Sequence, residues 1–226
     1  MIVRIQRRIA WARSRSCGRA RSRRTAIRPG VIVWLGLAFA VFVPGAQGAD
    51  AQGRFAIKGA GLASCRDYTQ ARADQSQLVY SLLGWLDGYL TAYNQLSADT
   101  FDVAAWESTD LFAQILDGHC KTYSDHRFVT VVRAIVAEIA DQRLTQNSPL
   151  IAARNGGQGL LIYQETLRRV QEKLSQRGLY SGAIDGRFDD PTRAALERFQ
   201  AGQGLAVSGL PDQPTLWKLF RPPPTQ

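Results

Sequence analysis

Apolar residues recur at helical spacing through the middle of the chain. In one stretch a leucine returns at every fourth position, at Leu78, Leu82, Leu86 and Leu90. Side chains three and four residues apart lie on one face of a helix, so this stretch predicts an amphipathic helix. The same period predicts a second helix over about 104–119 and a third over about 127–144. Three such helices can share one core, and we predict a helical bundle over 64–144.

A second helical pattern, with clear start and stop residues, occupies 161–221. Its first apolar stripe runs over 167–174, and Gly178 follows where a residue with positive φ commonly ends a helix. Asp190 and Pro191 then favour a new helix, because Asp accepts hydrogen bonds from the first backbone N–H groups and Pro needs no partner there. Asp212 can cap a third helix. We expect three short helices around one small core.

The turn and helix residues of this stretch follow a recognisable order. They are Val170-Gln171, Leu174, Gly178-Leu179-Tyr180, Gly182, Ile184-Asp185-Gly186, Phe188, Thr192-Arg193-Ala194-Ala195-Leu196, Phe199-Gln200, Gly204-Leu205, Gly209 and Thr215-Leu216. In this order and spacing they resemble the peptidoglycan-binding domain found at the ends of many cell-wall enzymes. The resemblance covers about a quarter of the chain and implies a three-helix module that binds the wall polymer without cutting it. Asp189-Asp190 stands where Gly is common in the family, which bears on ligand affinity more than on the fold.

The predicted peptidoglycan contacts are four residues of this module: Tyr180, Asp185, Arg187 and Gln200. Tyr180 would offer a flat face to sugar C–H groups. The other three would form hydrogen bonds with hydroxyls, amides or the carboxylates of the peptide stem. Each of the four can instead be a turn or cap residue, as most of the remaining signature is expected to be core and turn.

The N-terminal region carries the basic character of the chain. Residues 1–30 contain ten arginines and no acidic residue, so a net charge of +9 leaves about −1 for everything after them. Such a run could bind nucleic acid, but the apolar run 31–43 that follows has the length of a signal-peptide core. We predict a signal peptide over 1–48 and a periplasmic protein. We expect no nucleic-acid partner and no membrane span after cleavage; the alternative is an uncleaved anchor.

Composition divides the rest of the chain. Residues 49–63 are rich in Gly and Ala and are expected to form a flexible leader, and residues 145–160 are rich in Asn, Gly and Gln and are expected to form a linker. Residues 222–226 form a short proline-rich tail. The predicted fold class is all-α: a disulfide-linked helical bundle, 64–144, joined by the linker to a three-helix peptidoglycan-binding domain, 161–221.

Two cysteines lie in the predicted bundle, Cys65 before its first long helix and Cys120 at the end of its second. In an exported protein such a pair indicates a disulfide, which would stabilise the fold by about 4 kcal/mol on the chain-entropy model. His119 and His126 lie nearby and could be metal ligands with Cys120. However, adjacent helical residues point about 100° apart, and no fourth ligand is evident. We predict neither a metal site nor a cofactor.

The bundle sequence also has a weaker resemblance. Residues 85–94, Trp-Leu-Asp-Gly-Tyr-Leu-Thr-Ala-Tyr-Asn, follow one Cys and precede another at the end of the next predicted helix. This arrangement resembles small periplasmic helical proteins, among them acid-stress chaperones and immunity proteins of the type VI secretion system. The resemblance implies a disulfide-linked bundle that binds other proteins.

No catalytic residue is predicted. A zinc amidase needs several His and a carboxylate, and a cysteine transpeptidase needs a free thiolate. A lysozyme-like enzyme needs placed carboxylates, which Asp87, Glu107 and Glu138 could nominally supply. We predict a non-catalytic protein that binds peptidoglycan and presents 64–144 to a periplasmic protein. The alternatives are a peptidoglycan hydrolase or hydrolase activator with its chemistry in 64–144, and a C-terminal module that docks proteins without affinity for the wall.

Overall fold

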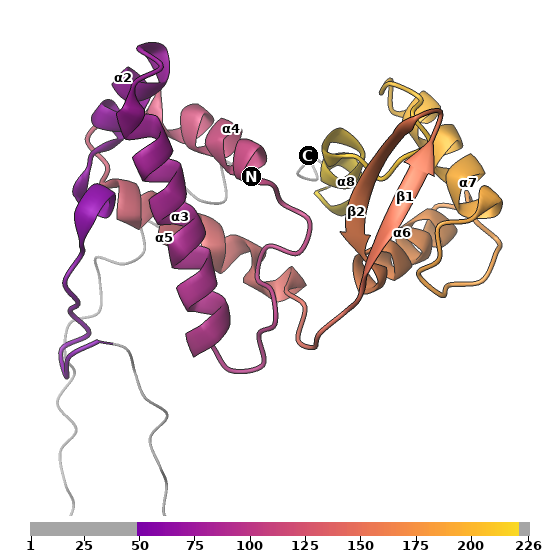
Figure 1. Ribbon diagram of the computed structural model, residues 1–226, viewed down its shortest axis with the longest axis horizontal. Coiled ribbons are helices and arrows are strands. Elements are labelled where there is room, and N and C mark those ends of the chain that lie inside the picture. The colour runs from indigo at the N-terminus through magenta and orange to yellow at the C-terminus, as the bar shows by residue number, and fades with distance from the viewer. Residues whose placement is uncertain (1–48, 222–226) are drawn as a thin grey trace, which may run out of the picture.

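The structure, a computed structural model, describes residues 49–221, which form two lobes (Figure 1). The N-terminal lobe, called the bundle, contains η1 (Gly59–Leu62), α2 (Cys65–Ala73), α3 (Gln77–Leu96), α4 (Thr109–Cys120), α5 (Phe128–Ile139) and η2 (Ala140–Gln142). The C-terminal lobe contains β1 (Leu150–Asn155), β2 (Gln158–Tyr163), α6 (Gln164–Gln176), α7 (Asp190–Gly202) and α8 (Gln213–Phe220). The predicted signal, 1–48, and tail, 222–226, lie outside the described residues. Within 49–221, no helix combines the length and apolarity that crossing a membrane requires.

Helix α5 provides much of the core of the bundle. Its apolar residues, three and four positions apart, are all at most 1% exposed: Phe128, Val131, Val132, Ile135, Val136 and Ile139. Burying each large aliphatic or aromatic side chain contributes about 1.5–3 kcal/mol relative to leaving it in water. The periodicity did not predict α2, which is mostly polar. This helix begins with a capping box, in which Ser64 and Asp67 each accept a hydrogen bond from the other's backbone N–H.

The predicted disulfide is confirmed. Cys65 and Cys120 are bonded to each other, with Cα atoms 4.7 Å apart and a sequence separation of 55. Both are fully buried. The Cys65 backbone N–H also donates to the His126 carbonyl at 2.8 Å. The bond therefore joins the start of α2 to the end of α4 beside the turn that leads into α5.

The expectation of an all-α fold is wrong at the start of the C-terminal lobe. Within 145–160, expected to be a linker, the chain forms β1 and the first half of β2, which pair antiparallel with Asn155 opposite Gln158. Gly156 and Gly157 have φ of 55° and 82°, as required at both central residues of a two-residue type I′ hairpin turn. The Gly-rich composition therefore marks a tight turn rather than a flexible connection.

The segment expected to be a flexible leader, 49–63, includes η1, which packs against α3. The Trp85 indole N–H donates to the Lys58 carbonyl at 2.9 Å. Gly61 is buried beneath this ring, and a Cβ there would lie 2.4 Å from its carbon atoms. Glycine at this position therefore lets η1 approach Trp85 closely.

The two lobes contact each other through α8 and the segment before α4. Arg221 forms an ion pair with Glu107 at 3.0 Å, and the two side chains are only 12% and 3% exposed. Burial raises the pKa of Glu107, and the Arg221 guanidinium opposes part of that rise. Phe220 packs on Trp106 with ring centroids 5.6 Å apart. Because the pair is shielded from water, it fixes the C-terminal end of α8 against the bundle.

Candidate functional site

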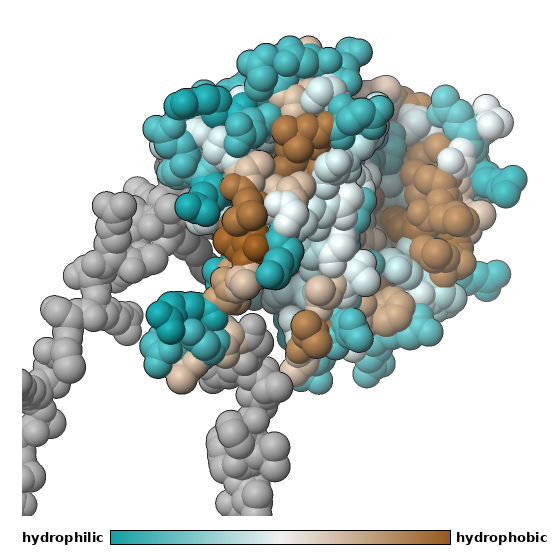
Figure 2. All heavy atoms as spheres, turned by 60° about the vertical axis from the view of Figure 1, so that its left-hand side comes forward, coloured by the Kyte–Doolittle hydropathy of each residue, from teal (hydrophilic) through white to brown (hydrophobic). Residues whose placement is uncertain are grey.

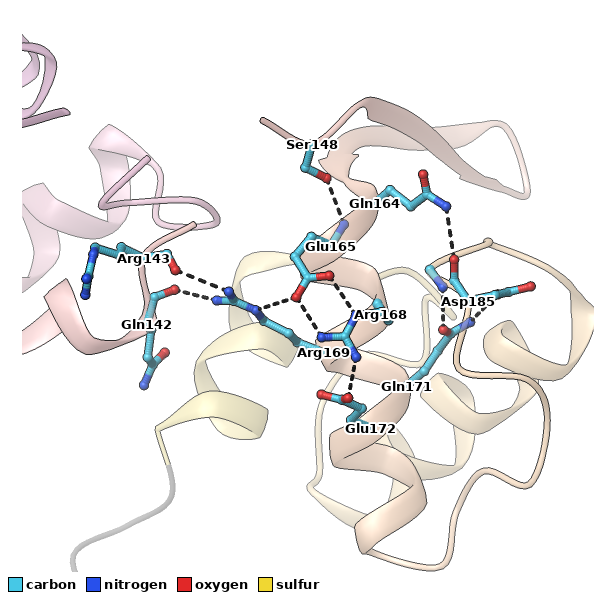
Figure 3. Close-up of polar contacts among 11 residues, drawn as sticks. Gln142, Arg143, Ser148, Gln164, Glu165, Arg168, Arg169, Gln171, Glu172 and Asp185 are labelled. Atoms are coloured by element: carbon cyan, nitrogen blue, oxygen red, sulfur yellow. Dashed lines mark hydrogen bonds and ion pairs between the residues drawn. The ribbon is translucent and has the colours of Figure 1, made fainter. Parts of the chain in front are cut away.

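A buried glutamine holds the loop between α6 and α7 from the inside. Gln171 is fully buried, and its Nε2 donates to the Arg187 carbonyl and to Thr192 Oγ1, both at 3.0 Å. Its Oε1 accepts from the Gly186 N–H at 2.8 Å. Figure 3 shows this side chain pointing from α6 toward the loop that carries Asp185. A buried amide with these bonds satisfied fixes the backbone around it.

Tyr180 belongs to the same interior. It is only 5% exposed, and its hydroxyl donates to the Ala183 carbonyl at 2.6 Å. A Cβ on Gly182 would lie 2.7 to 3.0 Å from the Tyr180 hydroxyl and ring. The expectation that Tyr180 offers an exposed face to sugars is therefore wrong, because the ring supports the loop from below.

Gln200 has the same role one helix later. It is fully buried, and its Nε2 donates to the Leu210 carbonyl and to Thr215 Oγ1, both at 2.9 Å. Its Oε1 accepts from the Gly209 N–H at 2.8 Å. The expectation that Gln200 is available to a ligand is wrong for the same physical reason: its amide is used inside the domain.

These two networks arise from a short internal repeat that the sequence analysis missed. Each unit combines a helical Gln, a loop Gly with positive φ and an Asp-x-Pro-Thr sequence that begins the next helix: Gln171, Gly186 and 189–192 in the first unit, Gln200, Gly209 and 212–215 in the second. In both units the Asp side chain accepts from the backbone N–H of the Thr, at 2.9 and 3.0 Å. Aligning the two Asp-x-Pro-Thr sequences would have been the signal for it.

Asp185 and Arg187 remain at the surface, as predicted, on the loop that the first network holds. The Asp185 carboxylate accepts from the Arg187 backbone N–H at 2.9 Å, and the Asp185 carbonyl accepts from the Gln164 amide at 3.0 Å. Ile184, expected in the core, is 43% exposed beside them. The accessible part of the predicted site is therefore a fixed loop, 183–188, which presents a carboxylate, a guanidinium and an apolar side chain.

Comparison with known proteins now identifies this lobe. Residues 163–219 match the family described as "Putative peptidoglycan binding domain". The resemblance drawn from the sequence is confirmed for this part of the chain. A Mycobacterium tuberculosis protein named "N-acetylmuramoyl-L-alanine amidase CwlM" is 30% identical over 135 residues, and it shares this region. The match covers 58% of this chain and 33% of that protein, so the chain spans about a third of its length. No solved structure matches.

Charged residues along α6 connect the peptidoglycan-binding domain to the bundle (Figure 3). Arg168 pairs with Glu165 at 2.7 Å and also with Glu172. Arg169 donates to Glu165 at 3.1 Å and to two backbone carbonyls at the end of η2, at 2.6 and 3.2 Å. Hydrogen bonds from Arg168 lower the pKa of Glu165. These charges neutralise one another, so they form a structural link rather than an open binding surface.

Two histidines form a second polar cluster, in the bundle. His119 Nε2 lies 3.0 Å from His126 Nδ1, and the Tyr123 ring stacks on His126 with centroids 5.0 Å apart. His119 is 1% exposed, and burial, assisted by His126, lowers its pKa. Cys120 is bonded to Cys65 and is not a free thiolate. Within residues 49–221, no three His, Cys, Asp or Glu side chains are grouped in a way that could hold a metal ion.

Proposed function

We propose that this is an exported, non-catalytic protein that binds peptidoglycan through its C-terminal domain and presents its bundle to a periplasmic protein. The observation that carries the proposal is the match of residues 163–219 to a peptidoglycan-binding family. The fixed, exposed loop 183–188 supports it, since a preformed surface loses little entropy when it binds a ligand.

The contacts of the residues that could act on the wall support a non-catalytic role. The sulfurs of Cys65 and Cys120 are bonded to each other, so neither can be a thiolate nucleophile. Glu107 is buried against Arg221, where its carboxylate stabilises the interface between the lobes. Asp87 accepts a hydrogen bond from Thr109 at 3.1 Å, joining α3 to α4. In each case we infer that the side chain serves the fold.

The surface of the bundle supports a protein partner. Its exposed large apolar residues, 40–79% exposed, are Phe55, Leu62, Leu78, Tyr80 and Leu96. Figure 2 shows a face of the molecule on which separate apolar patches lie among hydrophilic residues. Apolar surface of this kind is available for contact with another protein. The bundle is therefore the part of the chain in which we expect a protein-binding face.

A single experiment tests the two claims about the wall, that the protein binds it and that it does not cut it. The chain without its predicted signal, 49–226, is incubated with purified insoluble peptidoglycan, and the pellet and the soluble muropeptides are both measured. We expect the protein in the pellet and no muropeptide above a no-protein control. A protein that stays in solution would refute wall binding.

The competing function is a wall hydrolase or hydrolase activator, favoured by the relative named as an amidase. In that case soluble fragments would be released from the same wall preparation. Glu107→Gln and Asp87→Asn would then be compared with the parent protein, because both variants remove a carboxylate and keep a hydrogen-bonding group. Release that either variant abolishes, with binding retained, would establish catalysis.

A further inference from the structure

A cleft of about 750 Å³ lies between the two lobes. One of its walls comes from α4 and the other from α8, which Figure 1 shows on the side of the C-terminal lobe that faces the bundle. None of the four predicted contact residues, Tyr180, Asp185, Arg187 and Gln200, lines it. Its volume falls in the range of sites that bind small molecules and short peptides.

The walls of the cleft are held at a fixed separation. Gln213, at the start of α8, donates to the Trp106 carbonyl and accepts from both the backbone N–H and the hydroxyl of Ser108, each at 3.1 Å. The buried pair of Glu107 and Arg221 lies along the same interface. Since both ends of α8 are attached to the bundle, ligand binding carries no free-energy cost for bringing the lobes together.

The lining combines an apolar floor with two opposite charges. Leu111 and Ile115 of α4 are 9% and 8% exposed, and the half-buried Trp217 of α8 completes the floor. Asp110 on α4 and Lys218 on α8 are both exposed at the cleft. Within residues 49–221, neither of these two charges forms an ion pair. The cleft therefore offers an anion-binding and a cation-binding group on opposite walls.

We propose that this cleft binds the peptide stem of peptidoglycan, an inference that rests on the proposed wall-binding function. A stem is a short peptide with small apolar side chains and free carboxylates, and an uncross-linked diamino acid adds an ammonium group. Lys218 binds a stem carboxylate, Asp110 binds the ammonium, and Leu111, Ile115 and Trp217 contact the methyl groups. A neutral N-acetylated sugar would leave both charges unused. Charge complementarity therefore favours the peptide over the glycan.

The test measures binding of residues 49–226 to two forms of the same wall preparation. One is intact insoluble peptidoglycan, and the other is glycan strands from which an amidase has removed the stems. The variants are Lys218→Glu, Asp110→Lys and Trp217→Ala, and the matched control is Lys121→Glu, an exposed lysine just after the far end of α4. We expect Lys218→Glu to weaken binding to intact wall about tenfold, as for loss of a charged hydrogen bond. Lys121→Glu should bind as the parent does.

The outcomes separate this inference from the function on which it rests. If the parent protein fails to bind intact wall, the proposed function itself is refuted. If the parent binds and both charge-reversal variants bind equally well, the cleft is not the stem site. Equal binding to stripped glycan strands would also overturn the inference. Because Asp110 and Lys218 are exposed, their variants keep the test decisive even if Trp217→Ala fails to fold.

Discussion

The two units of the peptidoglycan-binding domain share one internal network but differ in what surrounds it. In the first unit the glutamine and the threonine that it binds are 21 residues apart in sequence, and in the second they are 15 residues apart. The spacing is thus six residues longer in the first unit, whose loop presents Ile184, Asp185 and Arg187 to solvent. The second is followed by α8, which contacts the bundle and lines the cleft. The same buried amide therefore supports two different surfaces.

This difference explains why recognising the domain does not locate its ligand. The signature residues Gln171, Gly186, Gln200 and Gly209 are occupied in holding the two loops. Side chains outside the networks are the ones left to contact a ligand, and the charged Arg187 beside Gly186 is replaced by Leu210 beside Gly209. The family match therefore identifies the scaffold, whereas the position of the ligand depends on the residues that the scaffold exposes.

Replacing each glutamine by leucine should have the largest effect and test whether the networks are equivalent. Gln171→Leu leaves the Gly186 N–H without its partner and removes one of the two donors to the Arg187 carbonyl, which keeps Thr192 Oγ1 at 3.3 Å. Gln200→Leu leaves both the Gly209 N–H and the Leu210 carbonyl without their partner. Each unpaired buried group costs about 1–3 kcal/mol, so we expect about 3 kcal/mol of lost stability in both variants. Urea denaturation followed by circular dichroism measures this loss.

The matched control is Gln176→Leu, at an exposed position near the end of α6, which should change stability little. A loss in Gln200→Leu less than half that in Gln171→Leu would show that the second network is not equivalent to the first. It would also show that contacts with the bundle compensate for the missing amide.

Alanine at the loop glycines should then separate the two units. Gly186 and Gly209 both have positive φ, 71° and 64°. A Cβ at Gly186 would lie 2.4 Å from the Gln164 backbone oxygen, whereas a Cβ at Gly209 would meet only side-chain atoms, the nearest at 2.9 Å. Because side chains can move and the α6 backbone cannot easily do so, we expect Gly186→Ala to cost about 2–3 kcal/mol and Gly209→Ala about 1–2 kcal/mol.

Gly178→Ala provides the reference for these two variants. Gly178 has φ of 69°, but a Cβ there would have no neighbour within 4 Å. Its loss of stability, about 1 kcal/mol, measures backbone strain alone. If Gly186→Ala costs no more than Gly178→Ala, the close approach of the loop to Gln164 does not restrict residue 186.

The sequence predicted the parts of this domain that depend on neighbouring residues. Gly178 and the Asp and Pro residues near the helix starts are read from local chemistry, because positive φ and N-capping involve residues only a few positions apart. The cap of α7 is Asp189, however, and the expectation that Asp190 caps this helix is wrong by one residue. The burial of Tyr180 and Gln200 was not predicted. Both are polar types usually found at surfaces, and their partners lie in turns that the fold brings together. Recognising the repeat would have indicated that Gln200 has the same role as Gln171, because each is a helical Gln followed by a loop Gly and an Asp-x-Pro-Thr sequence.

The hairpin and the cleft were missed for different reasons. Residues 154–158, Arg-Asn-Gly-Gly-Gln, contain a hairpin turn signal, but the flanking strands lack the apolar and polar alternation that would have identified them. The cleft depends on how α8 lies against α4, which no local pattern records. A buried Glu107–Arg221 pair, 114 residues apart, fixes that arrangement. Sequence patterns therefore predicted the bundle and the three-helix module, whereas the contact surface between them was found only in the structure.

The Tyr180 hydroxyl tests a contact that only the first unit has. It donates to the Ala183 carbonyl at 2.6 Å inside the longer loop. Tyr180→Phe removes this donor and keeps the ring, so we expect a loss of about 1 kcal/mol in thermal or urea unfolding. Wall binding should stay unchanged if Tyr180 only supports the loop. A variant that is fully stable but binds the wall poorly would instead restore a direct role for this tyrosine.

The smallest effect is expected at the helix cap of the first unit, where it depends on pH. Hydrogen bonds from Thr192 lower the pKa of Asp189 below its ordinary value of 3.8. The folded state binds a proton at Asp189 less readily than the unfolded state does. The stabilisation by this cap is therefore fully present above the ordinary pKa of Asp189. It is lost as the pH falls through the lower pKa of Asp189 in the folded state.

Asp189→Asn keeps a capping oxygen that does not titrate. The difference in unfolding free energy between the parent and this variant should therefore be constant from pH 7 to about 5 and should move against the parent below pH 3.8. A difference that does not change with pH over that range would show that Thr192 does not hold Asp189 in its charged form.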